Sequence, residues 1–148
     1  MREKIRLRPA REGDLAAILT IERLSFSTPW QAVHFWAELY KNYARLWVAE
    51  TEGRVVGYIC FWVIAGEAHL ANIAVHPSFR GRGVGSKLLK TFLRYAKRHG
   101  AKRAFLEVRA SNRIARRFYE KFGFEKEGVR RSYYQDTKED AVLMSKVL

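Results

Sequence analysis

Hydrophobic and polar residues follow two different periods along this chain, and together they predict strands and helices in a definite order. Runs rich in β-branched and aromatic residues mark the strands, and apolar residues three to four positions apart mark the helices. The order β-α-α-β-β-β-α-β-α-β-β predicts an α/β fold in which helices cover both faces of one mixed sheet. The seven expected strands are Ile5–Arg8, Leu46–Thr51, Val55–Ile64, Ala68–His76, Lys102–Val108, Phe124–Tyr134 and Ala141–Val147.

Four helices are expected between these strands, each with an apolar stripe that should face the sheet. Asp14, Thr28 and Ser111 are the expected caps of the first, second and fourth helices, and Thr28 also opens a capping-box pattern. Gly100 should end the third helix. The expected stripes are Leu15, Ile18, Leu19 and Leu24; Val33, Trp36, Ala37 and Tyr40; Val84, Leu88, Leu89, Phe92 and Ala96; and Ile114, Phe118 and Phe122.

Length and composition limit the class of protein. A chain of 148 residues, 48% of them hydrophobic, can fill one core, so we expect a single domain over residues 1–148. No run of about 18 uncharged apolar residues occurs and the chain does not begin like a signal peptide, which predicts a soluble, cytoplasmic protein with no membrane partner. The single cysteine, Cys60, lies in an apolar run; we expect it in the core, and a cysteine-rich metal site is excluded.

The net charge of +13 is concentrated in one segment. Between Arg80 and Arg131 there are seventeen Lys and Arg against four Glu, whereas the rest of the chain holds eleven residues of each sign. A surface for a polyanionic partner would produce this asymmetry. The alternative is that these residues are only the solvent-facing sides of two helices.

The segment Arg80-Gly81-Arg82-Gly83-Val84-Gly85 lies between a predicted strand and a predicted helix. Glycine allows positive φ and a close approach of the backbone to a ligand, and the start of a helix attracts anions. The spacing does not fit a Walker loop, and a dinucleotide fingerprint would open an early βαβ unit rather than follow a hairpin. The segment therefore predicts a pyrophosphate-binding loop, with a purely structural glycine turn as the alternative.

Four motifs, in order, carry a resemblance to a known family. They are ANIAVHP at 71–77, the Arg-x-x-Gly-x-Gly loop, LEVRASN at 106–112 and FYEKFGF at 118–124. With these motifs the chain closely resembles the GNAT acetyltransferases, and within them the RimI-type ribosomal-protein alanine N-acetyltransferases and the archaeal N-terminal acetyltransferases. FSTPW at 26–30, RRSYY at 130–134 and EDA at 139–141 extend the likeness over nearly the whole chain.

The resemblance implies a GNAT fold, with a mostly antiparallel seven-stranded sheet whose central parallel pair, Ala68–His76 and Lys102–Val108, splays apart to hold acetyl-CoA. The acetyl-pantetheine arm would pair with main-chain groups of the first of these strands, and the pyrophosphate with the glycine loop. No metal is expected. The implied cofactor-binding residues are Ile73, Ala74, Val75, Arg80, Gly81, Arg82, Gly83, Val84, Gly85, Ser86, Asn112 and Tyr119.

An amine that attacks a thioester must lose a proton, and the departing thiolate must gain one. Glu107 is the expected base by resemblance, since the family's pattern places a glutamate at this point of the splayed strand. A glutamate in an otherwise apolar strand also favours a site, because it costs free energy if it is buried without a partner. An ion pair with Arg109 or Lys102 is the alternative for Glu107, and His69 is a weaker candidate base. Tyr119 is the expected general acid by resemblance, since a phenol with a pKa of about 10 is protonated at neutral pH.

The resemblance also implies the acceptor, an α-amine at a protein N-terminus. Such an amine has a pKa of roughly 8, so a modest base suffices. The acceptor would enter between the 26–30 turn and the 133–134 region, where aromatic side chains can enclose a small residue. The expected substrate-binding residues are Phe26, Pro29, Trp30, Asn72, Tyr133 and Tyr134.

The function expected from these features is direct acetyl transfer, in a ternary complex, to the N-terminal alanine of a ribosomal protein. A broader N-terminal acetyltransferase, a lysine or small-amine acetyltransferase and a non-catalytic acyl-CoA-binding module remain as alternatives. Coenzyme A phosphates account for part of the positive segment Arg80–Arg131. Docking on ribosomal RNA or the ribosome is the hypothesis for the rest, although no RNA-binding motif is present.

Overall fold

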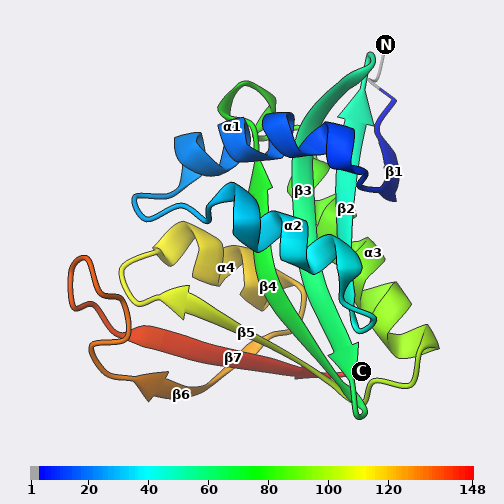
Figure 1. The fold of residues 1–148 in the computed structure, drawn as a ribbon. Helices are drawn as coiled ribbons and strands as arrows, with labels where there is room; N and C mark the ends of the chain where they lie inside the picture. Colours follow the sequence, from blue (N-terminus) through cyan, green and yellow to red (C-terminus); the bar gives the residue numbers. More distant parts are fainter. Residues whose placement is uncertain (1–3) are drawn as a thin grey trace.

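The computed structural model describes residues 4–148, so residues 1–3 of the expected domain lie outside it. Residues 4–148 form one seven-stranded sheet with the order β1-β2-β3-β4-β5-β7-β6 (Figure 1). All neighbouring strands are antiparallel except β4 and β5, which are parallel. The strands are β1 Arg6–Pro9, β2 Ala44–Thr51, β3 Arg54–Ile64, β4 Glu67–Val75, β5 Arg103–Arg109, β6 Glu125–Arg130 and β7 Ala141–Val147.

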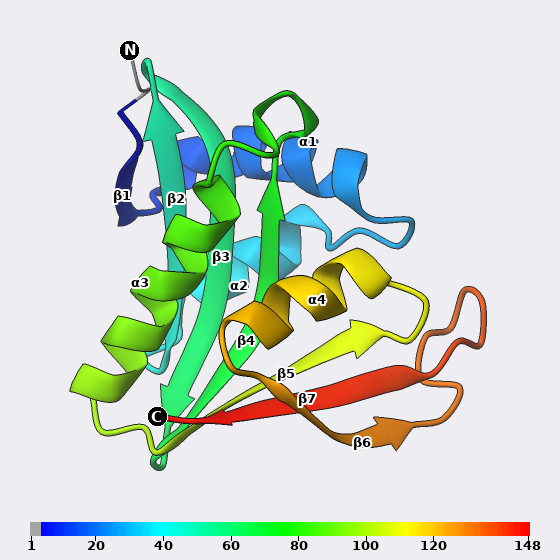
Figure 2. The same cartoon turned by 180° about the vertical axis from the view of Figure 1, so that it is seen from behind.

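Helices cover both faces of this sheet, as predicted. The helices are α1 Leu15–Ser25, α2 Ala32–Tyr40, α3 Val84–Arg98 and α4 Arg113–Lys121. Figure 1 shows α1 and α2 in front of the sheet, and the reverse view in Figure 2 shows α3 and α4 on the opposite face. The predicted mixed sheet and the predicted element order are both confirmed. No helix within residues 4–148 is long and apolar enough to cross a membrane.

The apolar stripe of α3 packs as the sequence predicts. Its five predicted core residues are all buried, because they repeat at helical spacing and the other side of the helix is charged. Phe92 stacks on Phe61 of β3 with ring centroids 4.8 Å apart. Cys60 is fully buried in the second cluster of core residues, between the sheet and α1 and α2, which confirms its expected place.

Three of the predicted helix caps are wrong. Their side chains make no capping hydrogen bond at the start of the predicted helix, because they interact with other parts of the fold. Asp14 occupies the N-cap position of α1, but its carboxylate accepts hydrogen bonds from Arg8 instead of capping that helix. Helix α2 begins after Gln31, three residues beyond Thr28. The cap of α4 is Asn112, not Ser111, and its side chain accepts from the main-chain nitrogen of Ala115 at 3.1 Å.

The predicted stripes of α1, α2 and α4 are each wrong at one or more positions. In α2 the sheet contacts Phe35 and Glu38, and the predicted Val33, Trp36 and Tyr40 are exposed. When a helix has apolar residues on more than one side, its tertiary contacts decide which side is buried. In α2 the Phe35 side is buried, because the Phe35 ring packs edge-on against Tyr58 of β3. In α4 the predicted Ile114 is 84% exposed, and Tyr119 is the residue that is buried. In α1, Leu24 is exposed and Glu22 takes its place in the core.

The strand expected over Phe124–Tyr134 is shorter than predicted. Strand β6 ends at Arg130, and Ser132 adopts a positive φ of 50° that β structure does not allow. Residues 131–140 instead form a loop between β6 and β7. This loop brings Tyr133 and Tyr134 toward the end of β5, near the 26–31 segment that joins α1 to α2.

Candidate active site

The parallel strands β4 and β5 separate soon after they meet. Within the described chain they pair over three positions, from Glu67 opposite Arg103 to His69 opposite Phe105. Beyond these positions β4 continues along β3 and β5 continues along β7. A bulge at Ala71, which has no partner between Leu70 and Asn72, bends β4 where the pairing stops. The side of β4 that faces β5 therefore has no strand partner from Leu70 onward, which leaves main-chain groups for a ligand.

A cavity of about 590 Å³ opens along this unpaired part of β4. It runs from the glycine loop and the first turn of α3 to the start of α4. The structure brings together in its wall every residue that the sequence predicts to bind acetyl-CoA except Arg82. Residues that are forty positions apart in sequence thus line one space, as the splayed-sheet prediction requires.

The glycine loop owes its shape to two residues with left-handed backbone. Gly81 has φ 77° and Gly83, at the N-cap of α3, has φ 84°, and a side chain at either position would be strained. Both glycines line the cavity beside Val84 and Gly85 of the first helical turn. The first turn of a helix carries main-chain N–H groups without helical acceptors, so this wall suits a diphosphate.

Of the two arginines in the glycine loop, Arg80 lines the cavity and Arg82 does not. Arg80 donates from Nε to the carbonyl oxygen of Val75 at 3.1 Å and from a terminal nitrogen to Ser25 Oγ at 3.3 Å. It therefore ties the loop to the ends of β4 and α1 while it lines the cavity. The guanidinium of Arg82 lies 5.0 Å from the centre of the Phe79 ring. Arg80 is thus at the predicted place, and Arg82 is not part of the cavity wall.

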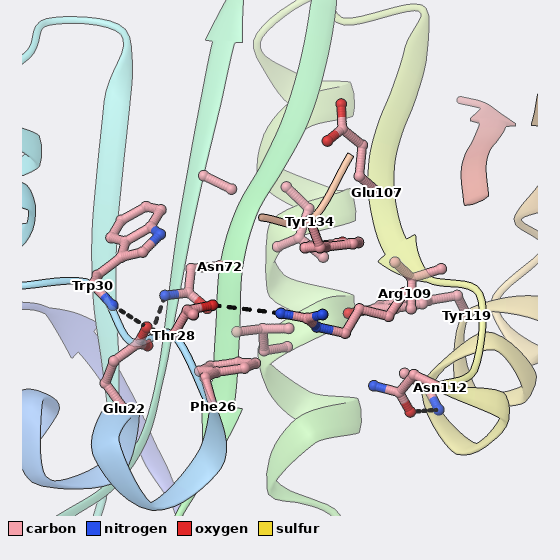
Figure 3. Close-up of a pocket in the computed structure, with 15 residues that line it drawn as sticks. Glu22, Phe26, Thr28, Trp30, Asn72, Glu107, Arg109, Asn112, Tyr119 and Tyr134 are labelled. Atoms are coloured by element: carbon pink, nitrogen blue, oxygen red, sulfur yellow. Dashed lines mark hydrogen bonds between the residues drawn. The ribbon is translucent and has the colours of Figure 1, made fainter. Parts of the chain in front are cut away.

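A second cavity, of about 280 Å³, lies between the separated strands and shares Ile73, Asn112 and Tyr119 with the first. Asn72 of β4 and Glu107 of β5 line it from opposite sides, so the cavity reaches across from one strand to the other (Figure 3). A third cavity, of about 500 Å³, continues outward from Glu107 along β5 and β7. Because the second cavity shares lining residues with both of the others, the three cavities adjoin, and we refer to them together as the passage.

Tyr119 lies where the first and second cavities meet. Its side chain is 7% exposed and packs edge-on against Phe118 and Phe124. Burial raises the pKa of the Tyr119 phenol above its ordinary value. The phenol is therefore protonated at neutral pH and is able to donate a proton into the passage.

Glu107 lies at the junction of the second and third cavities. Its side chain is 32% exposed, so the burial considered from the sequence does not occur. The separation of β4 from β5 opens this side of β5 to solvent. Glu107 pairs with Arg130 at 3.8 Å and bonds to the Tyr133 hydroxyl, which raises the pKa of Tyr133. Neither alternative partner, Arg109 or Lys102, forms an ion pair with Glu107 among the described residues.

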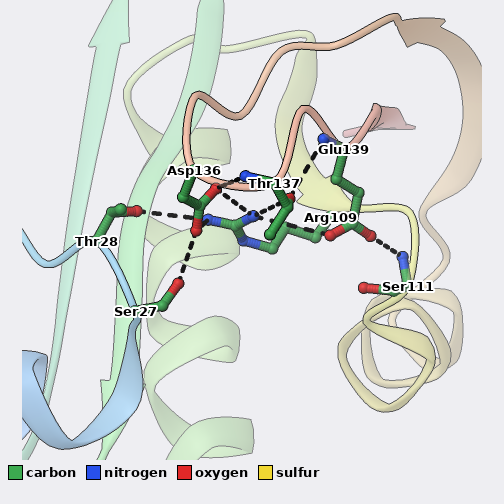
Figure 4. Close-up of polar contacts among 7 residues, drawn as sticks. All are labelled: Ser27, Thr28, Arg109, Ser111, Asp136, Thr137 and Glu139. Atoms are coloured by element: carbon green, nitrogen blue, oxygen red, sulfur yellow. Dashed lines mark hydrogen bonds and ion pairs between the residues drawn. The ribbon is translucent and has the colours of Figure 1, made fainter.

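Arg109 instead joins the two loops that flank the second cavity (Figure 4). It makes hydrogen bonds of 2.9 Å to both carboxylate oxygens of Asp136, and a longer one of 3.4 Å to Thr28. Its guanidinium also lies 4.0 Å from the centre of the Tyr134 ring. The segment after α1 and the loop after β6 are thus held against the end of β5.

Four of the six predicted substrate residues meet in the second cavity: Phe26, Trp30, Asn72 and Tyr134. Tyr133 lines the third cavity, and Pro29 lies in none of the three walls. The alternative base His69 lines the third cavity, where it stacks on Phe105 and pairs with Glu67 at 3.1 Å. Within residues 4–148 no group of three or more His, Cys, Asp or Glu side chains could hold a metal ion.

Sequence reasoning missed the buried carboxyl group in the wall of the second cavity, that of Glu22 in α1. Its side chain is buried and accepts hydrogen bonds from Asn72, from the main chain of Trp30 and from Tyr58. The signal in the sequence is its spacing. Glu22 lies four residues after Ile18, so the two side chains share one helix face. A carboxyl group therefore lies on the side of α1 that is expected to carry only apolar core residues.

Comparisons with known proteins agree with this geometry. The ribosomal protein bS18-alanine N-acetyltransferase of Escherichia coli K12 is 34% identical over 134 residues, which cover 89% of this chain and 90% of that protein. An N-alpha-acetyltransferase of Sulfurisphaera tokodaii is 36% identical over 157 residues, which cover 97% of this chain and 93% of that protein.

A solved structure and a family match complete the comparison. The crystal structure of the ribosomal-protein-S18-alanine N-acetyltransferase from Escherichia coli superposes with a TM-score of 0.90 at 30% identity, covering 97% of this chain and 94% of that chain. The sequence pattern of the acetyltransferase (GNAT) family matches residues 15–124. With the splayed β4–β5 pair and the glycine loop before α3, these matches show that the chain belongs to the GNAT family of N-acetyltransferases.

Proposed function

We propose that this protein transfers the acetyl group of acetyl-CoA to the α-amine at the N-terminus of another protein. The observation that carries the proposal is the passage between the splayed strands. The cavity along β4 and the glycine loop meets the cavity between β4 and β5 at Tyr119, and Glu107 lies on its other side. An acyl donor and an amine acceptor can therefore enter from opposite sides and meet.

GNAT enzymes use acetyl-CoA, and the wall of the larger cavity fits that molecule. The unpaired edge of β4 around Ile73 to Val75 offers main-chain groups to a pantetheine amide. The loop from Gly81 to Gly85 offers N–H groups and a helix start to a diphosphate. Asn112 and Tyr119 line the inner end of the cavity, where the thioester would lie.

Two side chains would handle the protons. Bound acetyl-CoA would supply the acetyl group as an activated thioester. Glu107, directly or through one water, would accept the proton that the amine nitrogen loses as its bond to the acetyl carbon forms. Tyr119 would donate its phenolic proton to sulfur as the carbon–sulfur bond breaks, and solvent would return both groups to their starting states. This direct transfer needs no covalent bond to the enzyme and no metal.

The names of the relatives support a protein N-terminus as acceptor, and N-terminal alanine of a ribosomal protein as its specific form. The second cavity is small, at about 280 Å³, and Phe26, Trp30 and Tyr134 enclose it. These dimensions favour a short first residue. A ribosomal protein acceptor also places the reaction in the cytoplasm.

A peptide panel tests the proposal. The protein is incubated with acetyl-CoA and peptides that begin with Ala, Ser or Met-Leu, or that carry an internal Lys behind a blocked N-terminus, and products are identified by mass spectrometry. We expect acetylation at the α-amine of the Ala peptide first. Comparable rates on Ser and Met-Leu would indicate a broad N-terminal enzyme. Acetylation of the internal Lys alone, or no heat of binding with desulfo-CoA in calorimetry, would overturn the proposal.

The charge of the α3 and α4 face supports a second part of the proposal, docking on ribosomal RNA. Both helices lie on the same face of the sheet (Figure 2). Their exposed basic residues form no ion pair within residues 4–148, so we define a cationic face by them. It consists of Lys87, Lys90, Arg94, Lys97, Arg98, Arg113, Arg117 and Lys121. The two helices carry a single acidic residue, Glu120, and a surface with so many cations attracts a polyanion larger than one coenzyme.

A pair of triple variants tests this docking. Replacing Arg94, Lys97 and Arg98 with Gln should weaken binding to a structured ribosomal RNA fragment at least tenfold and flatten its salt dependence. The control replaces three exposed arginines elsewhere, at positions 6, 11 and 23, and should have a much smaller effect. Equal losses in both variants, or no RNA binding by the unaltered protein, would exclude a specific docking face.

A further inference from the structure

The buried carboxylate of Glu22 forms part of the wall of the second cavity. Its side chain is 1% exposed and comes from α1, opposite β5 and Glu107 (Figure 3). It accepts hydrogen bonds from Asn72 Nδ2 at 2.8 Å, from the main-chain nitrogen of Trp30 at 2.8 Å and from the Tyr58 hydroxyl. No Lys or Arg among residues 4–148 pairs with it. The donors come from β3, from β4 and from the segment before α2.

A negative charge in the core needs a reason, because a buried carboxylate loses its hydration. Glu38 of α2 offers a contrast within the same chain. It is also buried, at 5% exposed, but it pairs with Lys41 at 3.0 Å and accepts from the Trp62 indole at 3.1 Å. It lies outside the walls of the three cavities. Glu22 has only neutral donors, and two of them belong to residues that line the second cavity.

The first consequence concerns the amide of Asn72. One of its N–H groups is donated to Glu22, which fixes the orientation of the amide and presents the amide oxygen as an acceptor for a ligand. Asn72 follows the bulge at Ala71 and precedes Ile73, the first of the main-chain positions assigned to the acyl donor. An acceptor oxygen at this point suits an N–H of an incoming amine.

The second consequence concerns the segment that closes the cavity from the α1 side. The main-chain nitrogen of Trp30 donates to Glu22, and the Trp30 ring lies 5.0 Å from Phe35. The carboxylate therefore fixes the backbone that carries Phe26, Thr28 and Trp30 into the cavity wall. The single carboxyl group of Glu22 thus fixes both the orientation of the Asn72 amide on β4 and the position of the main chain at Trp30, which faces it.

We propose that Glu22 is a positioning residue for the acceptor amine, which it orients through the Asn72 amide and the Trp30 main chain. This inference rests on the proposed function, since it assigns the second cavity to the acceptor. The role assigned to Glu22 is to hold this geometry rather than to transfer a proton, since three donors from the protein fix its two oxygens.

The substitution Glu22→Gln tests the proposal at constant shape. A glutamine amide nitrogen would face one of the N–H donors and break that contact. We expect the KM for the acceptor peptide to rise at least tenfold, with a smaller change in kcat and a Kd for acetyl-CoA within twofold of the unaltered protein. Glu38→Gln is the matched control, since it neutralises a buried glutamate of the same face. It should leave the acceptor KM within twofold.

A double-mutant cycle separates positioning from general loss of structure. In an Asn72→Ala background, Glu22→Gln should raise the acceptor KM at least threefold less than it does alone. If Glu22→Gln does not fold, Tyr58→Phe removes one donor and should raise the same KM severalfold. Equal effects of Glu22→Gln and Glu38→Gln, or full additivity with Asn72→Ala, would overturn the inference. Failure of the unaltered protein to acetylate any peptide would instead overturn the proposed function.

Discussion

The guanidinium of Arg109 and the carboxylate of Asp136 form a two-pronged pair, with both hydrogen bonds at 2.9 Å. Arg109 ends β5, and Asp136 lies in the loop between β6 and β7. The same carboxylate accepts from Ser27 Oγ at 2.8 Å. One ion pair therefore joins three separate segments beside the second cavity, and the ionisation of Asp136 can be followed directly.

Arg109 holds the pKa of Asp136 at about 2, below the ordinary value of 3.8. A lowered pKa means that the folded state favours the ionised form, so this stabilisation is present above about pH 3.8 and is lost as the pH falls through about 2. We expect Arg109→Gln to return the pKa of Asp136 toward 3.8 in a carbon-13 NMR titration. Arg131→Gln, which alters an exposed arginine of the same loop, is the control. Equal shifts in both variants would contradict the assigned pair.

Tyr119→Phe removes the proposed proton donor and keeps the packing of the ring. We expect kcat to fall roughly 100-fold, the scale of general acid catalysis, while the Kd for acetyl-CoA changes less than threefold. Stopped-flow or steady-state assays and calorimetry provide the two measurements. Tyr95→Phe, a tyrosine of α3 that packs on His99, should retain full activity. Unchanged turnover in Tyr119→Phe would assign the thiolate proton to another donor.

Glu107→Gln removes the proposed proton acceptor from β5. The expected result is a loss of roughly 100-fold in kcat at neutral pH and a partial recovery at higher pH, where more of the amine is already neutral. Glu125→Gln, on the exposed edge strand β6, is the matched control. The pH–rate profile of kcat tests whether Glu107 is the general base. A profile with the same shape in the unaltered protein and in Glu107→Gln would move the base elsewhere in the passage.

The fold could be predicted from the sequence because its strongest signals are local. The stripe of α3 has one clear apolar side, and all five of its members are buried. The hairpin around Glu52 and Gly53 is equally local, since both residues have the positive φ that a tight turn requires. Signals of this kind need no knowledge of distant partners.

The faces of α1, α2 and α4 could not be predicted in the same way. Each of these helices has apolar residues on more than one side, and the sheet chooses among them. Phe35 and Glu22 are buried because of what they meet on β3 and β4, and Tyr119 because it packs against Phe124, just before β6. The same limit applied to the site. The glycine loop and Tyr119 could be predicted from the sequence. The partners of Glu107 and the contacts of Arg109 could not, because they depend on the path of the loop between β6 and β7, which no local sequence pattern indicates.

Gly83→Ala tests the glycine loop as the binding site for the coenzyme diphosphate. A residue with a side chain at φ 84° costs about 1–2 kcal/mol, and the loop would relax away from the shape that lines the cavity. The Kd for acetyl-CoA should rise about tenfold or more in calorimetry. Gly100→Ala is a matched control, because Gly100 has a similar φ of 85° after α3 but lies outside the cavity. It should lower thermal stability alone.

Leu88→Ala tests the core beneath the loop. Leu88 is fully buried between α3 and β3, so removing three carbons should leave a cavity and lower the free energy of unfolding by about 2–5 kcal/mol in urea titrations. Ile114→Ala removes the same number of carbons from a residue that the pattern of α4 assigns to the core but that is 84% exposed. Its effect on unfolding should stay within about 0.5 kcal/mol. A large loss in Ile114→Ala would mean that α4 presents to the sheet the face its sequence pattern indicates.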